Sequence, residues 1–289
     1  MTQDERNVKR GEKLAKVIAR SGICSRREAE RLIEAGRVAV NGFIETSPAV
    51  RVGPEDEVLV DGAPLPEPEP VRLWRYHKPV ERVVARHDPR GRPTIYDDLG
   101  EEVRHAMPVG RLDFMSEGLL LLTNDGELKR ALEHPSKGWT RRYRVRAYCP
   151  LPTAKLKRQL KQLERGIVVD GVHYGAVKAT LDREEGANKW FTFALREGKN
   201  REIRRILEHL GCKVNRLIRT SYGPFQLGGL KRGEVAEVPR KQLEELLGGL
   251  LAKVEERRMA AHPRGEMVYI GFDDDDEDDE RKSRGDGEA

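Results

Sequence analysis

An acidic side chain, Asp113, lies in a glycine- and serine-rich stretch directly before an apolar run, in GRLDFMSEGLLLLTNDGEL, residues 110–128. Loops supported by buried strands often carry catalytic groups, because a loop can direct a side chain that the core only supports. A lone carboxylate can act there as a nucleophile or stabilise positive charge that develops in a reaction. Asp beside small residues also often bonds its own backbone in a turn. Spacing alone leaves Asp113 as either a catalytic group or a turn residue.

Three further positions could complete a site around such a carboxylate. Arg204, in EGKNREIRRILEHLG, falls on the flank of a helix's apolar face, where its stem can pack on the core with the guanidinium at the rim. An ordinary surface arginine fits that spacing equally well. Tyr143 alternates with arginines in a predicted strand at residues 141–148, where tyrosine is most often a packing residue. Leu217, in NRLIRTSYGPF, is equally consistent with ordinary core.

The sequence around Asp113 resembles a known enzyme signature. GRLD at 110–113, SEG at 116–118 and LLTNDG at 121–126 are similar to the signature of the RsuA/RluB group of ribosomal pseudouridine synthases. The resemblance extends over about residues 11–240. It implies the pseudouridine synthase fold, an α+β architecture with a mixed, mostly antiparallel sheet.

The resemblance also implies a role for each candidate residue. Asp113 matches the catalytic carboxylate, Arg204 matches the arginine that pairs with it, and Tyr143 matches the tyrosine that stacks on the target base. Arg111 and Leu217 match residues of the substrate pocket. The family needs no cofactor and no metal.

The implied reaction breaks the N-glycosidic bond of an RNA uridine, rotates the uracil and rejoins it through its carbon 5. The sequence leaves open whether Asp113 attacks the ribose, attacks the base or stabilises charge on the sugar. Glu202 stands where the family usually has Gln, and Glu is frequent in the branch that acts on the large ribosomal subunit. Residues 87–99, HDPRGRPTIYDDL, also resemble that branch. We therefore expect 23S rRNA as substrate, without an indication of which uridine is modified.

Cysteine and histidine spacing predicts neither a disulfide nor a metal site. Cys24, Cys149 and Cys212 are odd in number, far apart and in no CxxC pair, and none of the seven His forms a ligand-spaced pair. We expect the three cysteines to be reduced packing residues.

Residues 11–63 are predicted to form a compact module of two helices followed by short strands. Ser25 and Glu28 are predicted to form a capping box at the start of the second helix, in which each side chain accepts a hydrogen bond from the other's backbone N–H. From LAKVIARSGICSRREAERLIEAGRVAVNG onward, the module resembles the small RNA-binding domain of ribosomal protein S4. Basic residues off the apolar positions are usually only a solvated face, but the resemblance favours phosphate contacts. The arginines concerned are Arg26, Arg27, Arg31 and Arg37.

A proline-rich linker, residues 64–70, follows the module and would let it move. Residues 71–251 alternate short strands and helices, which predicts the catalytic domain, and Leu119–Leu122 predicts its central buried strand. Beyond residue 251 the chain loses periodicity and becomes highly charged, so residues 252–289 are predicted to be a disordered tail.

Charge points to a polyanionic partner. The chain carries 54 Lys and Arg against 49 Asp and Glu, a net charge of +5, but residues 273–280 are eight consecutive acids. Residues 1–272 hold 51 basic and 39 acidic side chains, a net charge of +12. Such an excess indicates a nucleic acid, without distinguishing RNA from DNA. The resemblance makes ribosomal RNA of the large-subunit precursor the expected partner.

Other functions remain possible at this stage. No run is long enough to span a membrane, and MTQDERNVKRGEK lacks the apolar centre of a secretory signal, so we expect a cytoplasmic protein, and a monomer. A noncatalytic rRNA-binding or ribosome-assembly protein would suit the charge equally well, and 16S rRNA is an alternative substrate. A nuclease or glycosidase is less favoured, because it would need a metal or a second carboxylate, and only Glu117 is close to Asp113 in sequence.

Overall fold

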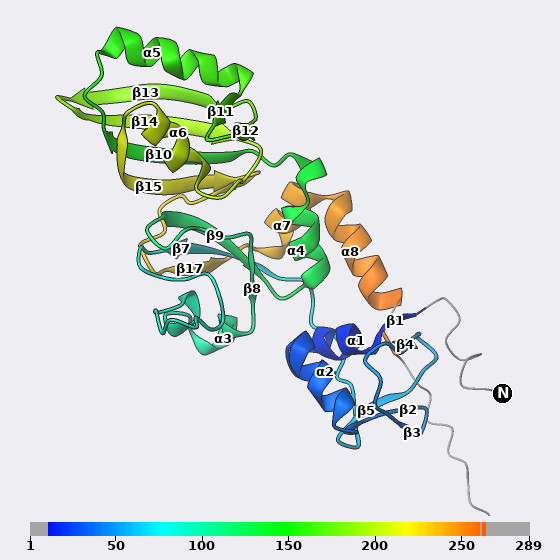
Figure 1. Ribbon diagram of the computed structural model, residues 1–289. Coiled ribbons are helices and arrows are strands. Elements are labelled where there is room, and N and C mark those ends of the chain that lie inside the picture. The colour runs from blue at the N-terminus through cyan, green and yellow to red at the C-terminus, as the bar shows by residue number, and fades with distance from the viewer. Residues whose placement is uncertain (1–10, 261, 264–289) are drawn as a thin grey trace, which may run out of the picture.

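The computed structural model describes residues 11–260, 262 and 263, which form a small N-terminal module and a larger domain (Figure 1). The module consists of β1 (Glu12–Lys13), α1 (Leu14–Arg20), α2 (Arg26–Glu34), β2 (Val38–Val40), β3 (Phe43–Glu45), β4 (Arg51–Val52), β5 (Val58–Val60) and β6 (Ala63–Pro64). Strands β3, β2, β5 and β6 form an antiparallel sheet in that order, and β1 pairs with β4. The Ser25 side chain accepts a hydrogen bond from the Glu28 N–H at 3.3 Å, which confirms the Ser25 half of the predicted capping box. The Glu28 carboxylate instead accepts from Arg31 at 2.8 Å.

The larger domain is built on a nine-stranded sheet within the described residues. Its strands are β7 (Leu73–Lys78), β8 (Met107–Val109), β9 (Glu117–Thr123), β10 (Arg141–Tyr148), β13 (Lys178–Glu185), β14 (Asn188–Leu195), β15 (Lys213–Tyr222), β16 (Phe225–Gln226) and β17 (Val235–Glu237). The main path runs β13-β14-β10-β15-β9-β7-β17, with β16 beside β15 and β8 beside β9. Only β9 and β15 pair in parallel. The predicted α+β class with a mixed, mostly antiparallel sheet is confirmed.

Helices cover the two faces of this sheet over different strands (Figure 1). Around the sheet lie the 3₁₀ turns η2 (Ile95–Asp97), η3 (Pro135–Lys137) and η4 (Leu163–Arg165), the hairpin of β11 (Ile167–Val169) and β12 (Val172–Tyr174), and the helices α3 (Glu101–Arg104), α4 (Gly126–Glu133), α5 (Thr153–Gln162), α6 (Glu202–His209), α7 (Arg240–Leu247) and α8 (Gly249–Ala260). Helices α5 and α6 share one apolar core with β10 and β14. Helices α4, α7 and α8 share a second core with β7 and β9.

Strand β9 separates the two cores. Leu120 and Leu122 enter the core under α6, whereas Leu119 and Leu121 enter the core under α4, α7 and α8. Because successive side chains of a strand point to opposite faces, a strand buried on both faces shows a continuous apolar run. The prediction of a central buried strand at these leucines is therefore confirmed.

The module contacts the larger domain through helix α1. The Lys16 Nζ lies 2.5 Å from a carboxylate oxygen of Glu127 in α4, and Arg20 donates a hydrogen bond to the carbonyl of Arg258 in α8 at 3.3 Å. The linker is also tied at its end, since Asn124 donates to the carbonyl of Pro70 at 2.9 Å. These contacts fix the position of the module against α4 and α8.

The predicted start of the tail is wrong. Helix α8 continues through residue 252 to Ala260, and Leu251, Val254 and Arg258 along it are buried. Arg258 lies 3.3 Å from the Asp125 carboxylate that caps α4. The apolar pattern did not predict the end of this helix, because one of its inward positions is an arginine rather than an apolar residue. The acidic run at 273–280 lies outside the described residues.

The prediction for two of the cysteines is also wrong. Cys149 and Cys212 form a disulfide, whereas Cys24 is a free cysteine. Cys149 follows β10 and Cys212 precedes β15, and the neighbouring residues Tyr148 and Lys213 are directly opposite each other in the antiparallel pair. Strand pairing brings the two sulfurs together across 63 residues of sequence, which spacing alone could not show.

Gly118 is required where β9 runs beside β15. Its φ of +108° disfavours other residues, and a Cβ at this position would lie 2.3 Å from the carbonyl oxygen of Arg219. This close approach lets the loop that carries Asp113 turn directly into the central strand.

We predict that Gly118→Ala lowers the free energy of unfolding by at least about 2 kcal/mol, because the methyl group meets backbone that cannot move away. Urea unfolding measures this. Gly126→Ala is the matched control, since its Cβ would meet only the Cε of Met107 at 3.9 Å. Equal stability of the two variants would contradict the argument.

Candidate active site

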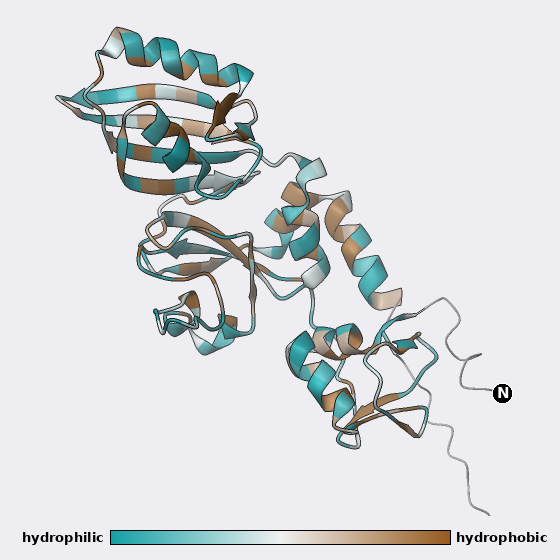
Figure 2. Ribbon diagram, in the orientation of Figure 1, coloured by the Kyte–Doolittle hydropathy of each residue, from teal (hydrophilic) through white to brown (hydrophobic). Residues whose placement is uncertain are grey.

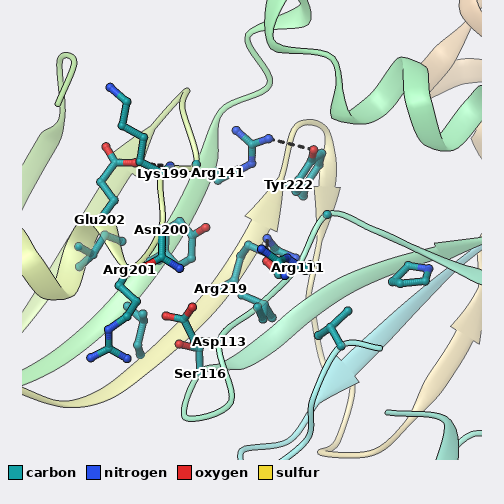
Figure 3. Close-up of a pocket in the computed structure, with 18 of the residues that line it drawn as sticks. Arg111, Asp113, Ser116, Arg141, Lys199, Asn200, Arg201, Glu202, Arg219 and Tyr222 are labelled. Carbon is teal, nitrogen blue, oxygen red and sulfur yellow. Dashed lines mark hydrogen bonds between the residues drawn. The ribbon is translucent and has the colours of Figure 1, made fainter. Parts of the chain in front are cut away.

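A cavity of about 750 Å³ lies where the two halves of the sheet meet (Figure 3). Its walls come from the loop before β9, from β10 and β15, and from the loop that leads into α6. Basic side chains predominate over the acidic Asp113, Glu133 and Glu202: Arg92, Arg111, Lys129, Arg141, Lys199, Arg201 and Arg219. The cavity therefore suits a polyanionic substrate.

Asp113 projects into this cavity from the loop between β8 and β9 (Figure 3). Its backbone carbonyl, not its carboxylate, closes the turn, by accepting a hydrogen bond from the N–H of Ser116 at 3.0 Å. The carboxylate is 30% exposed. The geometry thus favours the catalytic interpretation of Asp113 over the turn-capping one.

Lys78, which sequence reasoning missed, fixes the same loop from below. It is fully buried at the end of β7, and its Nζ donates to the carbonyls of Pro79 at 2.8 Å, Ser116 at 2.9 Å and Asp113 at 3.3 Å. Burial lowers its pKa to about 8, and the nearby Asp113 carboxylate opposes that shift. The sequence gives little sign of this role, because Lys78 ends a strand that also contains Arg75 and His77.

Arg204 lies beside Asp113, as the resemblance implies. Its Nε is 4.0 Å from Asp113 Oδ2, and its Nη2 donates to the carbonyl of Met115 at 2.9 Å. Burial and the neighbouring Arg201 lower the pKa of Arg204, while Asp113 raises it. Arg204 therefore supports the Asp113 loop from the side and is buried rather than a surface arginine.

Arg219 is a second buried guanidinium that sequence reasoning missed. It points inward from β15 and lines the cavity near Asp113 and Arg111 (Figure 3). Its Nε donates to the carbonyl of Leu119 at 2.7 Å, and its Nη2 has no hydrogen-bond partner within the described residues. This Nη2 atom is itself buried from solvent. In the sequence NRLIRTSY, Arg219 is two residues after Leu217, so its side chain is expected on the same face of the strand as that apolar residue.

Tyr143, Leu217 and Arg111 all line the same cavity. Tyr143 lies on β10 opposite Arg219 of β15, and Leu217 lies opposite the neighbouring Val145. Tyr143 and Leu217 are buried, whereas Arg111 is exposed at the rim. The structure therefore brings an aromatic ring, an apolar side chain and the Asp113 carboxylate to one pocket.

The four arginines of the N-terminal module lie elsewhere, on its exposed surface. Three have acidic partners: Arg26 with Glu30 at 3.3 Å, Arg31 with Glu28 at 2.8 Å, and Arg37 with Asp61 at 2.6 Å. Arg27 has no such ion pair in the part of the chain that the structure describes. Exposed pairs of this kind are weak, so these arginines can still exchange their partners for phosphates.

Glu202 shapes the loop that leads into α6. It is buried and accepts a hydrogen bond from the backbone N–H of Lys199 at 3.1 Å. Burial and the nearby Glu197 carboxylate raise its pKa to about 7. Residues Lys199 and Arg201 of this loop line the cavity, and Arg201 adopts a left-handed conformation with φ of 51°.

Comparisons with known proteins decide the family. Residues 72–209 match the model of the family described as RNA pseudouridylate synthase, and residues 12–58 match the S4 domain. The chain is 48% identical over 230 residues to an uncharacterized RNA pseudouridine synthase of Rickettsia bellii, covering 80% of this chain and 98% of that protein. The chain belongs to the RNA pseudouridine synthase family. The RsuA/RluB group expected from the sequence is confirmed.

Two further relatives place the synthase more closely. It is 41% identical over 245 residues to the ribosomal large subunit pseudouridine synthase B of Salmonella typhimurium, covering 82% of each chain. A crystal structure of a pseudouridylate synthase superposes with a TM-score of 0.56 at 26% identity, covering 81% of this chain and 99% of that one. The synthase is an isomerase that acts on RNA, and the S4 domain is an RNA-binding module. Within residues 11–260, 262 and 263, no helix has the length and hydrophobicity to cross a membrane.

We predict that the stability of the synthase falls as pH rises from about 5 to 8, because the raised pKa of Glu202 makes the folded state bind a proton that the unfolded state has released. This contribution is complete below the ordinary carboxyl pKa and is lost as pH rises through the folded value near 7. Glu202→Gln should flatten the dependence, as thermal unfolding across this range would measure.

The exposed Glu208 on the same helix provides the control. Glu208→Gln should retain the wild-type dependence on pH. If Glu202→Gln retained it as well, the buried carboxyl would not be its source.

Proposed function

We propose that this synthase converts a uridine of large-subunit (23S) ribosomal RNA to pseudouridine, with Asp113 as the catalytic carboxylate. The observation that supports this most is the position of Asp113 in a basic cavity with Arg204 beside it and Tyr143 in the same wall. The 41% identity to a ribosomal large subunit pseudouridine synthase supports the choice of RNA.

The reaction needs confinement more than it needs many catalytic groups. The bond between ribose carbon 1 and uracil N1 breaks, the uracil rotates, and its carbon 5 bonds to the same ribose carbon. Carbon 5 then loses its proton to water, and N1 takes up a proton. Asp113 serves as the nucleophile, at the ribose or the base, or stabilises the positive charge on the sugar. The walls of the cavity keep the detached uracil in place.

The surrounding side chains divide the remaining tasks. Arg204 orients the Asp113 carboxylate, since its own position is fixed by the carbonyl of Met115. Tyr143 offers an aromatic face to a uridine that has left its stack, an interaction worth about 1 to 3 kcal/mol per base. Arg219, which also lines the cavity, adds positive charge beside the position of the target uridine.

A hydrolytic mechanism with two carboxylates is less well supported. Glu117, the acid closest to Asp113 in sequence, is buried, and its two oxygens are held by Arg216 and Arg232. It does not line the cavity. The pair of opposed carboxylates that glycosidases use is thus not formed with Glu117.

The N-terminal module adds RNA affinity in this proposal. Its arginines Arg26, Arg27, Arg31 and Arg37 would contact phosphates of the same rRNA outside the cavity. The position of the module against α4 and α8 would set the distance between these phosphate contacts and the target uridine.

We predict that Asp113→Asn lowers pseudouridine formation to background, at least about a thousandfold, while RNA affinity changes little, because the amide keeps the shape but cannot act as the carboxylate. Tritium release from rRNA labelled at uridine carbon 5 measures the activity on 23S and 16S RNA separately. Glu245→Gln, an exposed change on α7, is the control. Release by Asp113→Asn at the wild-type rate would refute the catalytic role, and release from 16S RNA only would refute the substrate.

We predict that Tyr143→Leu slows turnover by about 10- to 100-fold and weakens RNA binding less, since stacking is needed mainly once the base has left the helix. Single-turnover rates and filter binding separate the two effects. A loss confined to affinity would show that Tyr143 acts only in docking.

A further inference from the structure

One face of the sheet is left open over β13, β14 and β10. Along β14, side chains alternate between buried and partly exposed, and the buried set faces α5 and α6. On the opposite face, helices α4, α7 and α8 pack over β7 and β9. No helix of the described chain packs with the outward residues of β10 and β14, which all remain accessible. Figure 2 shows hydrophilic and hydrophobic segments alternating along these upper strands.

This open face carries a row of arginines on its central strand. Arg142, Arg144 and Arg146 project to the same side of β10, about 7 Å apart along the strand. None of the three has a salt bridge in the described part of the chain, and the Nε of Arg146 is buried without a hydrogen-bond partner. We call this row, with Trp190 beside it, the open arginine face.

Trp190 contributes an aromatic surface to the row. The guanidinium carbon of Arg144 lies 5.0 Å from the centroid of the Trp190 ring, and Arg146 is opposite Trp190 in the strand pair. An arginine positioned over an aromatic ring can still donate hydrogen bonds to a ligand. The acid nearest to this row on β13, Asp182, already accepts hydrogen bonds from Thr180 and Thr192.

The row has an electrostatic cost, and apart from the contact of Arg144 with Trp190 it has no acidic partner in the described chain. Like charges on one face of a strand disfavour folding, whereas alternating charges would not. Arg216 of β15, on the same face, shows the alternative, because it is paired with the buried Glu117. An unpaired row of arginines is complementary to a polyanion, and guanidinium groups match phosphate geometry particularly well.

We infer that the open arginine face is a second RNA-binding surface, which contacts the phosphate backbone of the rRNA away from the target uridine. This inference rests on the proposed function, because it takes rRNA as the substrate. Tyr143 and Arg144 are neighbours on β10 and project to opposite faces. One short RNA segment therefore cannot contact both, and the second surface engages only an RNA large enough to reach around the sheet.

The test compares a short stem-loop substrate with full-length 23S rRNA, using the full chain. In the variant R142Q/R144Q/R146Q, affinity for 23S rRNA should fall at least about tenfold at 150 mM salt, and the slope of log affinity against log salt should fall by about 2 to 3. Affinity for the stem-loop and turnover on it should stay within about twofold of wild type. If that variant does not fold, Arg142→Gln alone should lower the slope by about 1.

Two control variants test whether the effect depends on where the arginines lie, and not only on net charge or on folding. K155Q/K157Q/K161Q removes the same charge from exposed positions of α5, on the other face of the sheet, and should keep the wild-type slope. R142K/R144K/R146K retains the charge and should keep most of the slope. An equal loss in the α5 variant would reduce the effect to net charge and overturn the inference.

The remaining outcomes are also decisive. An unchanged slope on 23S rRNA in the glutamine variant would overturn the inference, and that result together with weaker binding to poly-glutamate would assign the face to an acidic protein. Absence of pseudouridine formation by the wild-type chain on either RNA would instead refute the proposed function, and the salt slopes would still report on the open arginine face.

Discussion

The parallel pairing of β9 with β15 is the constraint on which the cavity depends. It joins the half of the sheet that carries the Asp113 loop to the half that carries Tyr143, Leu217 and Arg219. Gly118 permits the close approach, and Lys78 fixes the loop backbone through three carbonyls. The turn is therefore held without the carboxylate oxygens of Asp113. Its carboxylate is positioned by elements that are themselves buried, which is the arrangement that precise chemistry requires.

Charge is distributed so that each basic group has a different environment. Arg204 and Arg219 are buried beside the carboxylate, where water screens them little. The arginines of the N-terminal module are exposed and mostly paired with acids. The row on β10 is accessible and unpaired in the described chain. The net excess of positive charge is thus composed of a catalytic part and parts that can bind a long polyanion.

Much of the fold followed from the sequence, because apolar periodicity and turn residues specify strands and helices locally. The run at Leu119–Leu122 and the Ser25 cap were predicted in this way. Asp113, Tyr143 and Arg204 were assigned through resemblance, since their spacing fitted ordinary structural roles equally well. Their roles in catalysis remain proposals that the geometry supports.

The elements that the sequence did not predict share one physical cause. Three basic residues are buried at inward positions: Lys78, Arg219 and Arg258. A sequence pattern predicts a basic residue to be exposed unless its buried partners are known. Those partners are carbonyls and carboxylates distant in sequence, as are the two cysteines of the disulfide. These groups come together only when distant segments of the chain pair in the folded protein. Local sequence patterns therefore cannot predict their contacts.

The most direct measurement is a map of pseudouridines in the rRNA of cells that lack this gene, with the wild-type gene or its Asp113→Asn form restored. The account predicts that one 23S site loses its pseudouridine in the deletion, regains it with the wild-type gene and stays unmodified with Asp113→Asn. Restoration of the site by Asp113→Asn, or a map that is unchanged by the deletion, would contradict it.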